Sequence, residues 1–358
     1  MTSPAYPVRR LSLLAPACLA ACVAAPALAE ETDYVLTDAF DRPVLSVSYT
    51  SLESILTVPE APADAPSFVE IGGEGDAPGT PAEGGSDGND TYHLGDSDQP
   101  LLADSGGYDT ITSTVTRDLE DFPDMEHLVL LGSADIDGYG NVKANRIVGN
   151  DGDNVIAGRG GADTLMGGRG DDTYVLEAAT NDTIEDEDGD DTITSTITRD
   201  LADFPGIENL ELTFSAHVDG FGDEGPNRLV GNAGSNRLSG RGGDDTLDGG
   251  KGADTLEGGP GQDTFVLSDP AHSPPAAGHR DRIADFEPGV DRIDLSALGP
   301  LSFAGASAFS GVAGQVRVSA RDGYHMLEVD LDGDGAADAA IEIVSPDAPS
   351  EADLLLAE

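Results

Sequence analysis

A period of nine residues, with one large apolar residue in each period, is the feature that most constrains the fold of this chain. Copies of the pattern Gly-Gly-x-Gly-x-Asp-x-U-x, in which U is the large apolar residue, run without a break over 140–175 and again over 222–266. A helix face needs an apolar residue every three or four positions, so this spacing excludes an amphipathic helix. It favours a short strand with U pointing inward, followed by a glycine-rich turn.

Two strand–turn units form one coil of 18 residues, so each turn should lie over the turn two copies further along the chain. We therefore predict an all-β fold of parallel β-roll ladders joined by β spacers. The side chains expected inside the roll are Ile147, Ile156, Leu165, Tyr174, Leu229, Leu238, Leu247, Leu256 and Phe265.

A longer repeat indicates the domain organisation. The segment 109–119 recurs at 191–201, a shift of 82 residues, which indicates two long units that each contain a spacer and a ladder. The predicted divisions are a signal peptide (1–29), a short segment with an acidic Pro/Gly-rich linker (30–84), a first repeat unit (85–175), a second repeat unit (176–266) and a C-terminal region (267–358).

The sixth position of the nine-residue pattern is aspartate or asparagine in every copy. Stacked coils lie ~4.8 Å apart, so carboxylates on successive coils would face each other at about that distance. At an effective dielectric constant of ~20 each pair would repel by roughly 3 kcal/mol, and several pairs would cancel the stability of a domain, about 5–15 kcal/mol. A hard dication removes this penalty. Ca²⁺ accepts several carboxylate and carbonyl oxygens, and therefore fits such turns better than Mg²⁺ or Zn²⁺.

The stacking rule pairs these side chains across coils. Asp245 with Asp263 is the pair that has two aspartates, and we expect it to bind calcium more strongly than pairs in which asparagine supplies an oxygen but no charge. The mixed pairs are Asn236 with Asp254, Asn227 with Asp245, Asn154 with Asp172, and Asn145 with Asp163. The sequence thus predicts several calcium ions per chain.

The stretch from Asp245 to Asp263, Asp-Thr-Leu-Asp-Gly-Gly-Lys-Gly-Ala-Asp-Thr-Leu-Glu-Gly-Gly-Pro-Gly-Gln-Asp, resembles the RTX (hemolysin-type) family of calcium-binding repeats. This resemblance implies that backbone carbonyls at the second and fourth positions complete the calcium shell. In this chain those positions are Gly168, Gly170, Arg241, Gly243, Gly250, Gly252, Gly259 and Gly261. Arg159 and Arg241 stand where the family pattern has its second glycine.

The C-terminal sequence resembles the β-rich C-terminal domain of serralysin-type proteases. The resemblance rests on the segments 281–298 and 311–318, and it implies that this part caps the roll and belongs to a type I export region. The nearby segment Asp330-Leu-Asp-Gly-Asp-Gly335 has the spacing of an EF-type calcium loop, but Ile341 stands where a bidentate glutamate is expected. We therefore favour a turn between strands there.

The first 29 residues have the pattern of a secretory signal peptide. Two arginines precede an apolar run over 11–25, and small residues at 27–29 offer a cleavage site before Glu30. Cys22 lies in a sequence that resembles a bacterial lipobox, so a lipidated surface protein is one alternative, and type I export is another. Both cysteines fall in this segment, so we expect no disulfide in the mature chain. No later apolar run is long enough to span a bilayer.

The net charge and the absent catalytic motifs argue against several classes of function. A formal net charge of −50 argues against nucleic acid and anionic lipid as partners. None of the six histidines forms H-E-x-x-H, and G-x-S-x-G is absent from the sequence. We therefore expect a secreted, non-enzymatic protein that folds on binding calcium, with an adhesive or matrix-forming role. The alternatives are a divergent secreted hydrolase and a calcium-switched module that binds a protein or glycan.

Overall fold

The structure, a computed structural model, describes residues 88–95, 104, 106–177, 181–186 and 188–357, together with the backbone of four earlier strands. The chain divides into two compact units, Met1–Ala65 and Pro66–Glu358. The first unit holds a three-stranded sheet of β1 (Arg9–Ser12), β2 (Asp33–Thr37) and β3 (Pro43–Ser48). Apart from β1, the predicted signal peptide lies outside the described residues.

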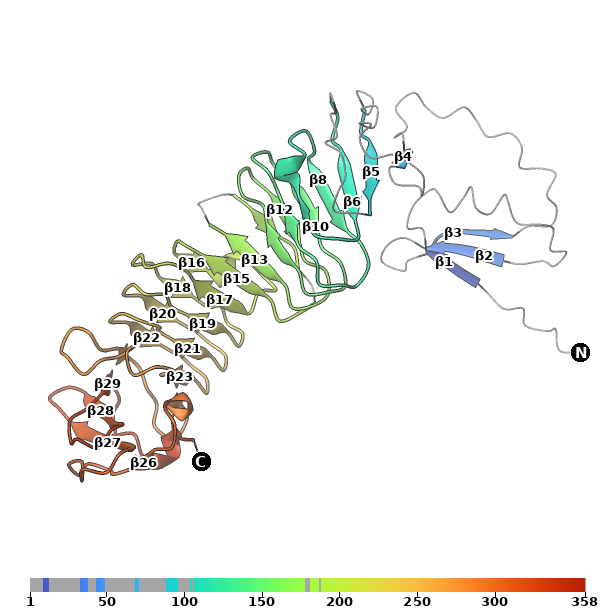
Figure 1. Cartoon of the computed structure of the whole chain (residues 1–358). Coiled ribbons are helices and arrows are strands. Elements are labelled where there is room, and N and C mark those ends of the chain that lie inside the picture. Colours follow the sequence, from blue (N-terminus) through green and yellow to red (C-terminus); the bar gives the residue numbers. More distant parts are fainter. Residues whose placement is uncertain are drawn as a thin grey trace, which may run out of the picture. The chain divides into compact units, whose positions relative to one another are not determined.

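The second unit is a solenoid of short strands (Figure 1). Among the described residues its only helical segments are 3-10 turns, and no helix is long and apolar enough to cross a membrane. The solenoid strands are β4 (Phe68–Glu70), β5 (Thr91–Leu94), β6 (Thr110–Ser113), β7 (Arg117–Asp118), β8 (His127–Leu130), β9 (Gly138–Tyr139), β10 (Arg146–Val148), β11 (Val155–Ala157), β12 (Thr164–Met166), β13 (Thr173–Leu176), β14 (Thr183–Ile184), β15 (Thr192–Ser195), β16 (Arg199–Asp200), β17 (Asn209–Leu212), β18 (Gly220–Phe221), β19 (Arg228–Val230), β20 (Arg237–Ser239), β21 (Thr246–Asp248), β22 (Thr255–Glu257), β23 (Thr264–Val266), β24 (Arg282–Ile283) and β25 (Arg292–Asp294).

Each nonapeptide strand pairs in parallel with the strand two copies further along, as the 18-residue coil predicts. In β10 and β12, Ile147 lies opposite Leu165, and in β21 and β23, Leu247 lies opposite Phe265. All nine U side chains are buried, with exposed fractions between 0% and 3%, and they belong to one continuous hydrophobic core. The predicted all-β class and parallel β-roll are confirmed.

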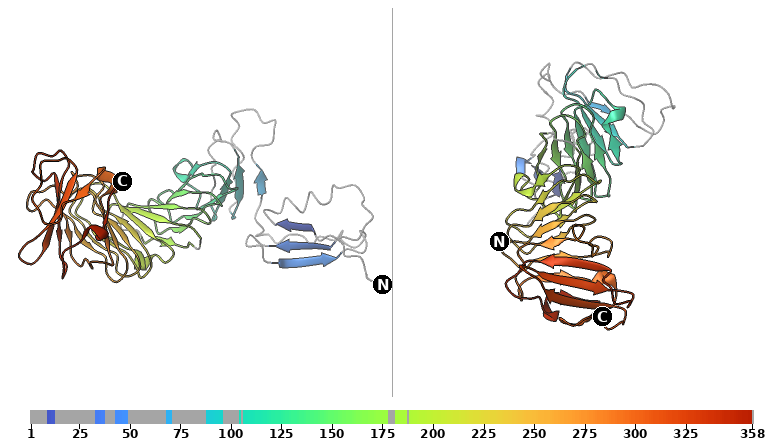
Figure 2. Two further views of the ribbon diagram at one scale, coloured as in Figure 1. Left: turned by 90° about the horizontal axis from the view of Figure 1, so that it is seen from below. Right: turned by 90° about the vertical axis from the view of Figure 1, so that its left-hand side faces the viewer.

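The spacers continue the solenoid, because their strands join the same sheets as the ladders (Figure 2). From β6 to β25, successive strands alternate between an eleven-stranded sheet and the opposite side of the solenoid. That opposite side is a seven-stranded sheet up to β14 and a nine-stranded sheet from β16 onward. Nine strand-to-strand steps separate β6 from its sequence equivalent β15, so equivalent strands of the two units lie on opposite sides.

The C-terminal cap extends two of these sheets. It contributes β26 (Ser302–Phe303), β27 (Gln315–Ala320), β28 (His325–Asp330), β29 (Ala339–Ile343) and β30 (Leu354–Leu355). Strand β29 pairs in parallel with β24, and β30 pairs in parallel with β25, so the cap is built directly onto the last coils. Strands β28 and β29 form an antiparallel pair. Residues 331–338 join them, so the segment 330–335 leads from a strand into a turn, as predicted.

Candidate metal centre

The five sixth-position aspartates are buried, and each is satisfied at one oxygen only. Asp163, Asp172, Asp245, Asp254 and Asp263 are each 1% exposed. Their Oδ1 atoms accept a backbone N–H from the preceding coil, as when the Asp245 N–H donates to Asp263 Oδ1 at 3.0 Å. Their Oδ2 atoms are buried and have no hydrogen-bond partner. A buried carboxylate oxygen without a partner is costly, and a bound cation would satisfy it.

Glycine at the first position of each copy makes room for this second oxygen. A Cβ atom placed on Gly258 would lie 2.2 Å from Asp263 Oδ2, and one on Gly240 would lie 2.0 Å from Asp245 Oδ2. Both distances are far inside van der Waals contact, so any other residue would force the carboxylate out of the turn. The repeated first glycine is therefore explained by the space that the carboxylate occupies.

Backbone carbonyls lie between the stacked turns, at the positions that the family resemblance implies. A Cβ on Gly259 would lie 1.8 Å from the Arg241 carbonyl oxygen, and one on Gly261 would lie 1.7 Å from that of Gly243. The other predicted turn glycines are stacked in the same way: Gly168 over Asn150, Gly170 over Gly152, Gly250 over Asn232, and Gly252 over Gly234. Carboxylate and carbonyl oxygens are the ligands that Ca²⁺ prefers.

Burial makes the ionised form of these aspartates unfavourable. It raises the pKa of Asp245 to about 7, with the charge of Asp263 adding to the effect. Burial also raises the pKa of Asp163, Asp172 and Asp263 to about 6. Burial and the neighbouring charge of Asp281 raise the pKa of Asp254. Near neutral pH a dication and protons would therefore compete for the same oxygens.

The predicted asparagine ligands have a different environment, because their amides are already hydrogen-bonded. Asn154 Oδ1 accepts the Asn150 N–H at 2.8 Å, and Asn154 Nδ2 donates to the Ile136 carbonyl at 2.6 Å. Asn236 repeats this arrangement with Asn232 and Val218. In Asn145 and Asn227, too, Oδ1 accepts a backbone N–H of the same turn, and Nδ2 donates to a carbonyl of the previous coil. The four mixed pairs are formed, but through the backbone N–H groups: Asn145 to Asp163, Asn154 to Asp172, Asn227 to Asp245 and Asn236 to Asp254.

The aspartate ladders continue beyond the nonapeptides, which the sequence analysis missed. Five more pairs of aspartates are joined by the same N–H to Oδ1 bond: Asp90 with Asp109, Asp163 with Asp182, Asp172 with Asp191, Asp254 with Asp281, and Asp263 with Asp291. Asp245 and Asp263 are therefore not the only stacked pair of aspartates. The signal was present as Asp-x-Ile triplets, which keep the end of the pattern without its glycine turn.

The two arginines at a glycine position are held by their side chains. Arg159 and Arg241 have left-handed backbone angles, with φ of 66° and 76°. Each guanidinium donates two hydrogen bonds to one aspartate, Asp118 or Asp200, on a spacer strand 41 residues earlier. The Arg241 guanidinium holds the pKa of Asp200 below its ordinary value. These paired contacts offset the backbone strain, which is on the order of 1 kcal/mol or more per residue.

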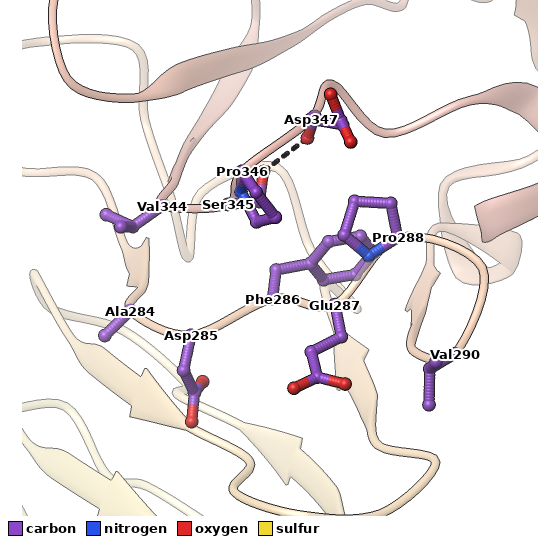
Figure 3. A pocket seen from close by; sticks show the side chains of 10 residues that line it. All are labelled: Ala284, Asp285, Phe286, Glu287, Pro288, Val290, Val344, Ser345, Pro346 and Asp347. Atoms are coloured by element: carbon purple, nitrogen blue, oxygen red, sulfur yellow. Dashed lines mark hydrogen bonds between the residues drawn. The ribbon is translucent and has the colours of Figure 1, made fainter.

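A hollow of about 480 Å³ lies within the C-terminal cap (Figure 3). Asp285, Phe286, Glu287 and Asp347 are among the residues that line it. The Asp285 carboxylate accepts the backbone N–H groups of Gly258 and the residue after it, at 3.1 and 2.9 Å. This carboxylate therefore fastens the cap to the last turn of the roll.

Comparison with known families agrees with this geometry. Residues 139–174 and 178–196 match the RTX calcium-binding nonapeptide repeat, and residues 232–356 match the peptidase M10 serralysin C terminal family. The chain carries RTX calcium-binding repeats and a serralysin C-terminal domain. Both are typical of secreted proteins. No curated protein sequence matches the chain.

Solved structures with local similarity include two subunits of the mannuronan C5-epimerase of Azotobacter vinelandii. AlgE6R3 is 30% identical, with 40% of this chain and 80% of that chain covered and a TM-score of 0.32. AlgE6R2 is 27% identical, with 40% and 93% covered and a TM-score of 0.30. The extracellular lipase LipA from Serratia marcescens is 17% identical, with 71% and 45% covered and a TM-score of 0.22.

Proposed function

We propose that this is a secreted, non-enzymatic calcium-binding protein whose β-roll folds when Ca²⁺ occupies the stacked RTX turns. The observation that carries the proposal is the set of buried, unpartnered Oδ2 atoms on the five turn aspartates. The turns offer only oxygen ligands at these points, and the repeat family binds calcium. We predict that the calcium-bound roll has an adhesive or matrix-forming role.

The free energy of calcium binding favours a roll that folds at millimolar calcium concentrations. Extracellular calcium modules bind with dissociation constants of about 10⁻⁴–10⁻³ M. At a free calcium concentration about ten times this constant, each site adds about 1.4 kcal/mol, so five sites would add roughly 7 kcal/mol. That is comparable with the whole stability of a domain, about 5–15 kcal/mol. At cytosolic calcium the contribution is close to zero.

Far-ultraviolet circular dichroism during a calcium titration tests the switch. We expect β-structure over 140–266 to appear cooperatively in the millimolar range, while Mg²⁺ at equal concentration does much less because it demands octahedral geometry. Trypsin resistance should rise over the same range. A calcium-stripped sample with an unchanged spectrum and unchanged protease resistance would refute the proposal.

The non-enzymatic part of the proposal rests on the sequence, which lacks the zincin and serine-hydrolase motifs. Purified protein in saturating calcium should show no proteolysis, lipolysis or glycan cleavage above that of a sample stripped of calcium. Calcium-dependent turnover in any of these assays would favour the divergent hydrolase instead.

The export route is tested by the mass of the secreted chain. Cleavage of the predicted signal peptide gives a protein that starts at Glu30, and lipidation gives one that starts at a modified Cys22. A secreted chain that keeps Met1 would show type I export through the C-terminal region.

A further inference from the structure

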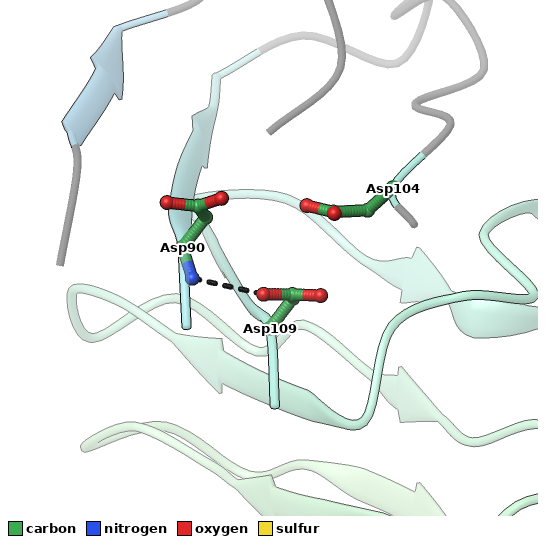
Figure 4. Close-up of side chains that lie close together, drawn as sticks. All are labelled: Asp90, Asp104 and Asp109. Atoms are coloured by element: carbon green, nitrogen blue, oxygen red, sulfur yellow. Dashed lines mark hydrogen bonds between the residues drawn. The ribbon is translucent and has the colours of Figure 1, made fainter. Parts of the chain in front are cut away.

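Two groups of three aspartates lie where repeat turns pass into spacers. In the first group Asp90, Asp104 and Asp109 each offer one carboxylate oxygen, and these oxygens all lie within 4.8 Å of one another (Figure 4). The second group has the same geometry and consists of Asp172, Asp186 and Asp191. In both groups one aspartate comes from a turn, one from the following spacer and one from the next coil.

The two groups are equivalent in sequence, because the shift of 82 residues converts one into the other. The residues around the middle aspartate differ between the two copies, which read Leu-Ala-Asp-Ser over 102–105 and Ile-Glu-Asp-Glu over 184–187. The middle aspartate is therefore retained where its neighbouring side chains are not.

A buried tyrosine orients the middle aspartate in each group. The Tyr174 hydroxyl donates to Asp186 Oδ2 and accepts the Gly167 N–H at 2.6 Å. Its equivalent, Tyr92, donates to Asp104 Oδ2 at 2.5 Å. Tyrosine occupies the U position only in the copies that precede a spacer, so its hydroxyl serves this contact and not the packing of the roll.

Two of the carboxylates in the second group have a buried oxygen without a partner. Asp172 and Asp191 are each 1% exposed, and the Oδ2 atom of each has no hydrogen bond. A Cβ on Gly167 would lie 2.0 Å from Asp172 Oδ2 and 2.6 Å from the Tyr174 hydroxyl, so the orphaned oxygen and the hydroxyl border the same glycine. Burial and the charges of Asp186 and Asp172 raise the pKa of Asp191.

We propose that each long unit holds a divalent-cation site, selective for Ca²⁺, between its repeat turn and its spacer, in which spacer carboxylates complete the ligand set of the turn aspartate. The ligands are Asp172, Asp186 and Asp191 in one unit and Asp90, Asp104 and Asp109 in the other. Three carboxylates and no nitrogen or sulfur ligand suit a hard cation. Tyr174 and Tyr92 are positioning residues. The inference rests on the proposed function, and it extends calcium binding from the RTX turns to the spacers.

The test uses Asp186, because this residue belongs to the spacer site and not to the turn ladder. Terbium(III), a hard ion that replaces calcium, emits when a nearby tyrosine is excited, and the chain has no tryptophan to interfere. We expect tyrosine-sensitised terbium emission in the full chain to fall in Asp186→Asn and to fall further in Asp104→Asn/Asp186→Asn, while terbium in the turn sites supplies the emission that remains. Calorimetry should show calcium affinity at one site weakened at least tenfold by Asp186→Asn.

Asp188→Asn is the matched control, since it removes the same charge two residues further on from an exposed side chain. It should leave emission and calcium stoichiometry at wild-type values. Saturating calcium should restore the wild-type circular dichroism of Asp186→Asn, which separates loss of a site from loss of folding; Asp104→Asn tests the other unit independently. If the wild type folds with calcium but both single variants keep wild-type emission and stoichiometry, the spacer sites are refuted. A wild type that binds no calcium refutes the proposed function as well.

Discussion

In the absence of calcium, acid should stabilise the roll that calcium stabilises at neutral pH. The turn aspartates have a raised pKa in the folded chain, so the folded state holds more protons than the unfolded state above pH 3.8. Stability is therefore greatest at low pH and is lost as pH rises through the folded-state pKa values of about 6 to 7. This is opposite to the behaviour of an aspartate whose pKa is lowered by an ion pair.

The size of the effect follows from the shifts. One pKa unit corresponds to about 1.4 kcal/mol, so the shift of Asp263 from 3.8 to about 6 corresponds to about 3 kcal/mol over its whole range. Only the part of each shift that lies above pH 5 counts between pH 5 and pH 8. For Asp163, Asp172, Asp245 and Asp263 together, that part lowers the free energy of unfolding by about 7 kcal/mol if the groups act independently. That loss is enough to unfold a typical domain.

The assay is far-ultraviolet circular dichroism of calcium-stripped protein from pH 5 to pH 9, repeated in about 10 mM calcium, which is above the usual range for extracellular sites. Without calcium we expect β-structure at pH 5 that is lost as the pH rises to about 7. With calcium the signal should stay constant. A stripped protein whose β-signal is flat across this range, or grows with pH, would refute the reasoning.

Other substitutions test separate parts of the site. Asp263→Ala should weaken calcium binding in calorimetry more than Asn236→Ala, because only the aspartate leaves an oxygen unpartnered; equal effects would contradict the paired-turn geometry. Gly258→Ala should lower calcium affinity and thermal stability by crowding a ligand carboxylate, whereas Gly95→Ala, which meets nothing within 4 Å, should be close to neutral. Arg241→Ala should lower the free energy of unfolding by about 1 kcal/mol, because the residue keeps its left-handed strain and loses its ion pair, and Arg241→Gly should lower it less.

The fold could be predicted from the sequence because the roll is periodic. Once one residue in nine is assigned to the core, the strand, the turn and the pairing of Ile147 with Leu165 follow together. The spacers were harder, since their strands lack the glycine turn that marks the repeat. Only the Asp-x-Ile triplet at residues such as Asp191 and Asp281 shows that the ladder goes on.

The sequence predicts which turn residues form the site, but it does not predict their hydrogen bonds. The sequence identifies asparagine as a weaker ligand than aspartate, yet it does not show that the Asn154 amide is already bonded to its own turn and to Ile136. Likewise, the arginine at position 241 departs from the repeat pattern, and its partner Asp200 lies 41 residues away in a spacer. Contacts at such separations depend on which coils stack, and a nine-residue pattern carries no information about them.

The nine strand steps in each 82-residue unit give the solenoid a parity. Adding or removing one unit would rotate all the coils that follow it by half a turn about the solenoid axis. Adding or removing two units would leave their orientation about that axis unchanged. Strands β5 and β22, two units apart, therefore belong to the same side of the roll, and β13 between them belongs to the other. A homologue that differs by one unit would present its C-terminal cap on the opposite flank of the roll. Arrays of this kind therefore keep the relative orientation of their two ends only when units are added or removed in pairs.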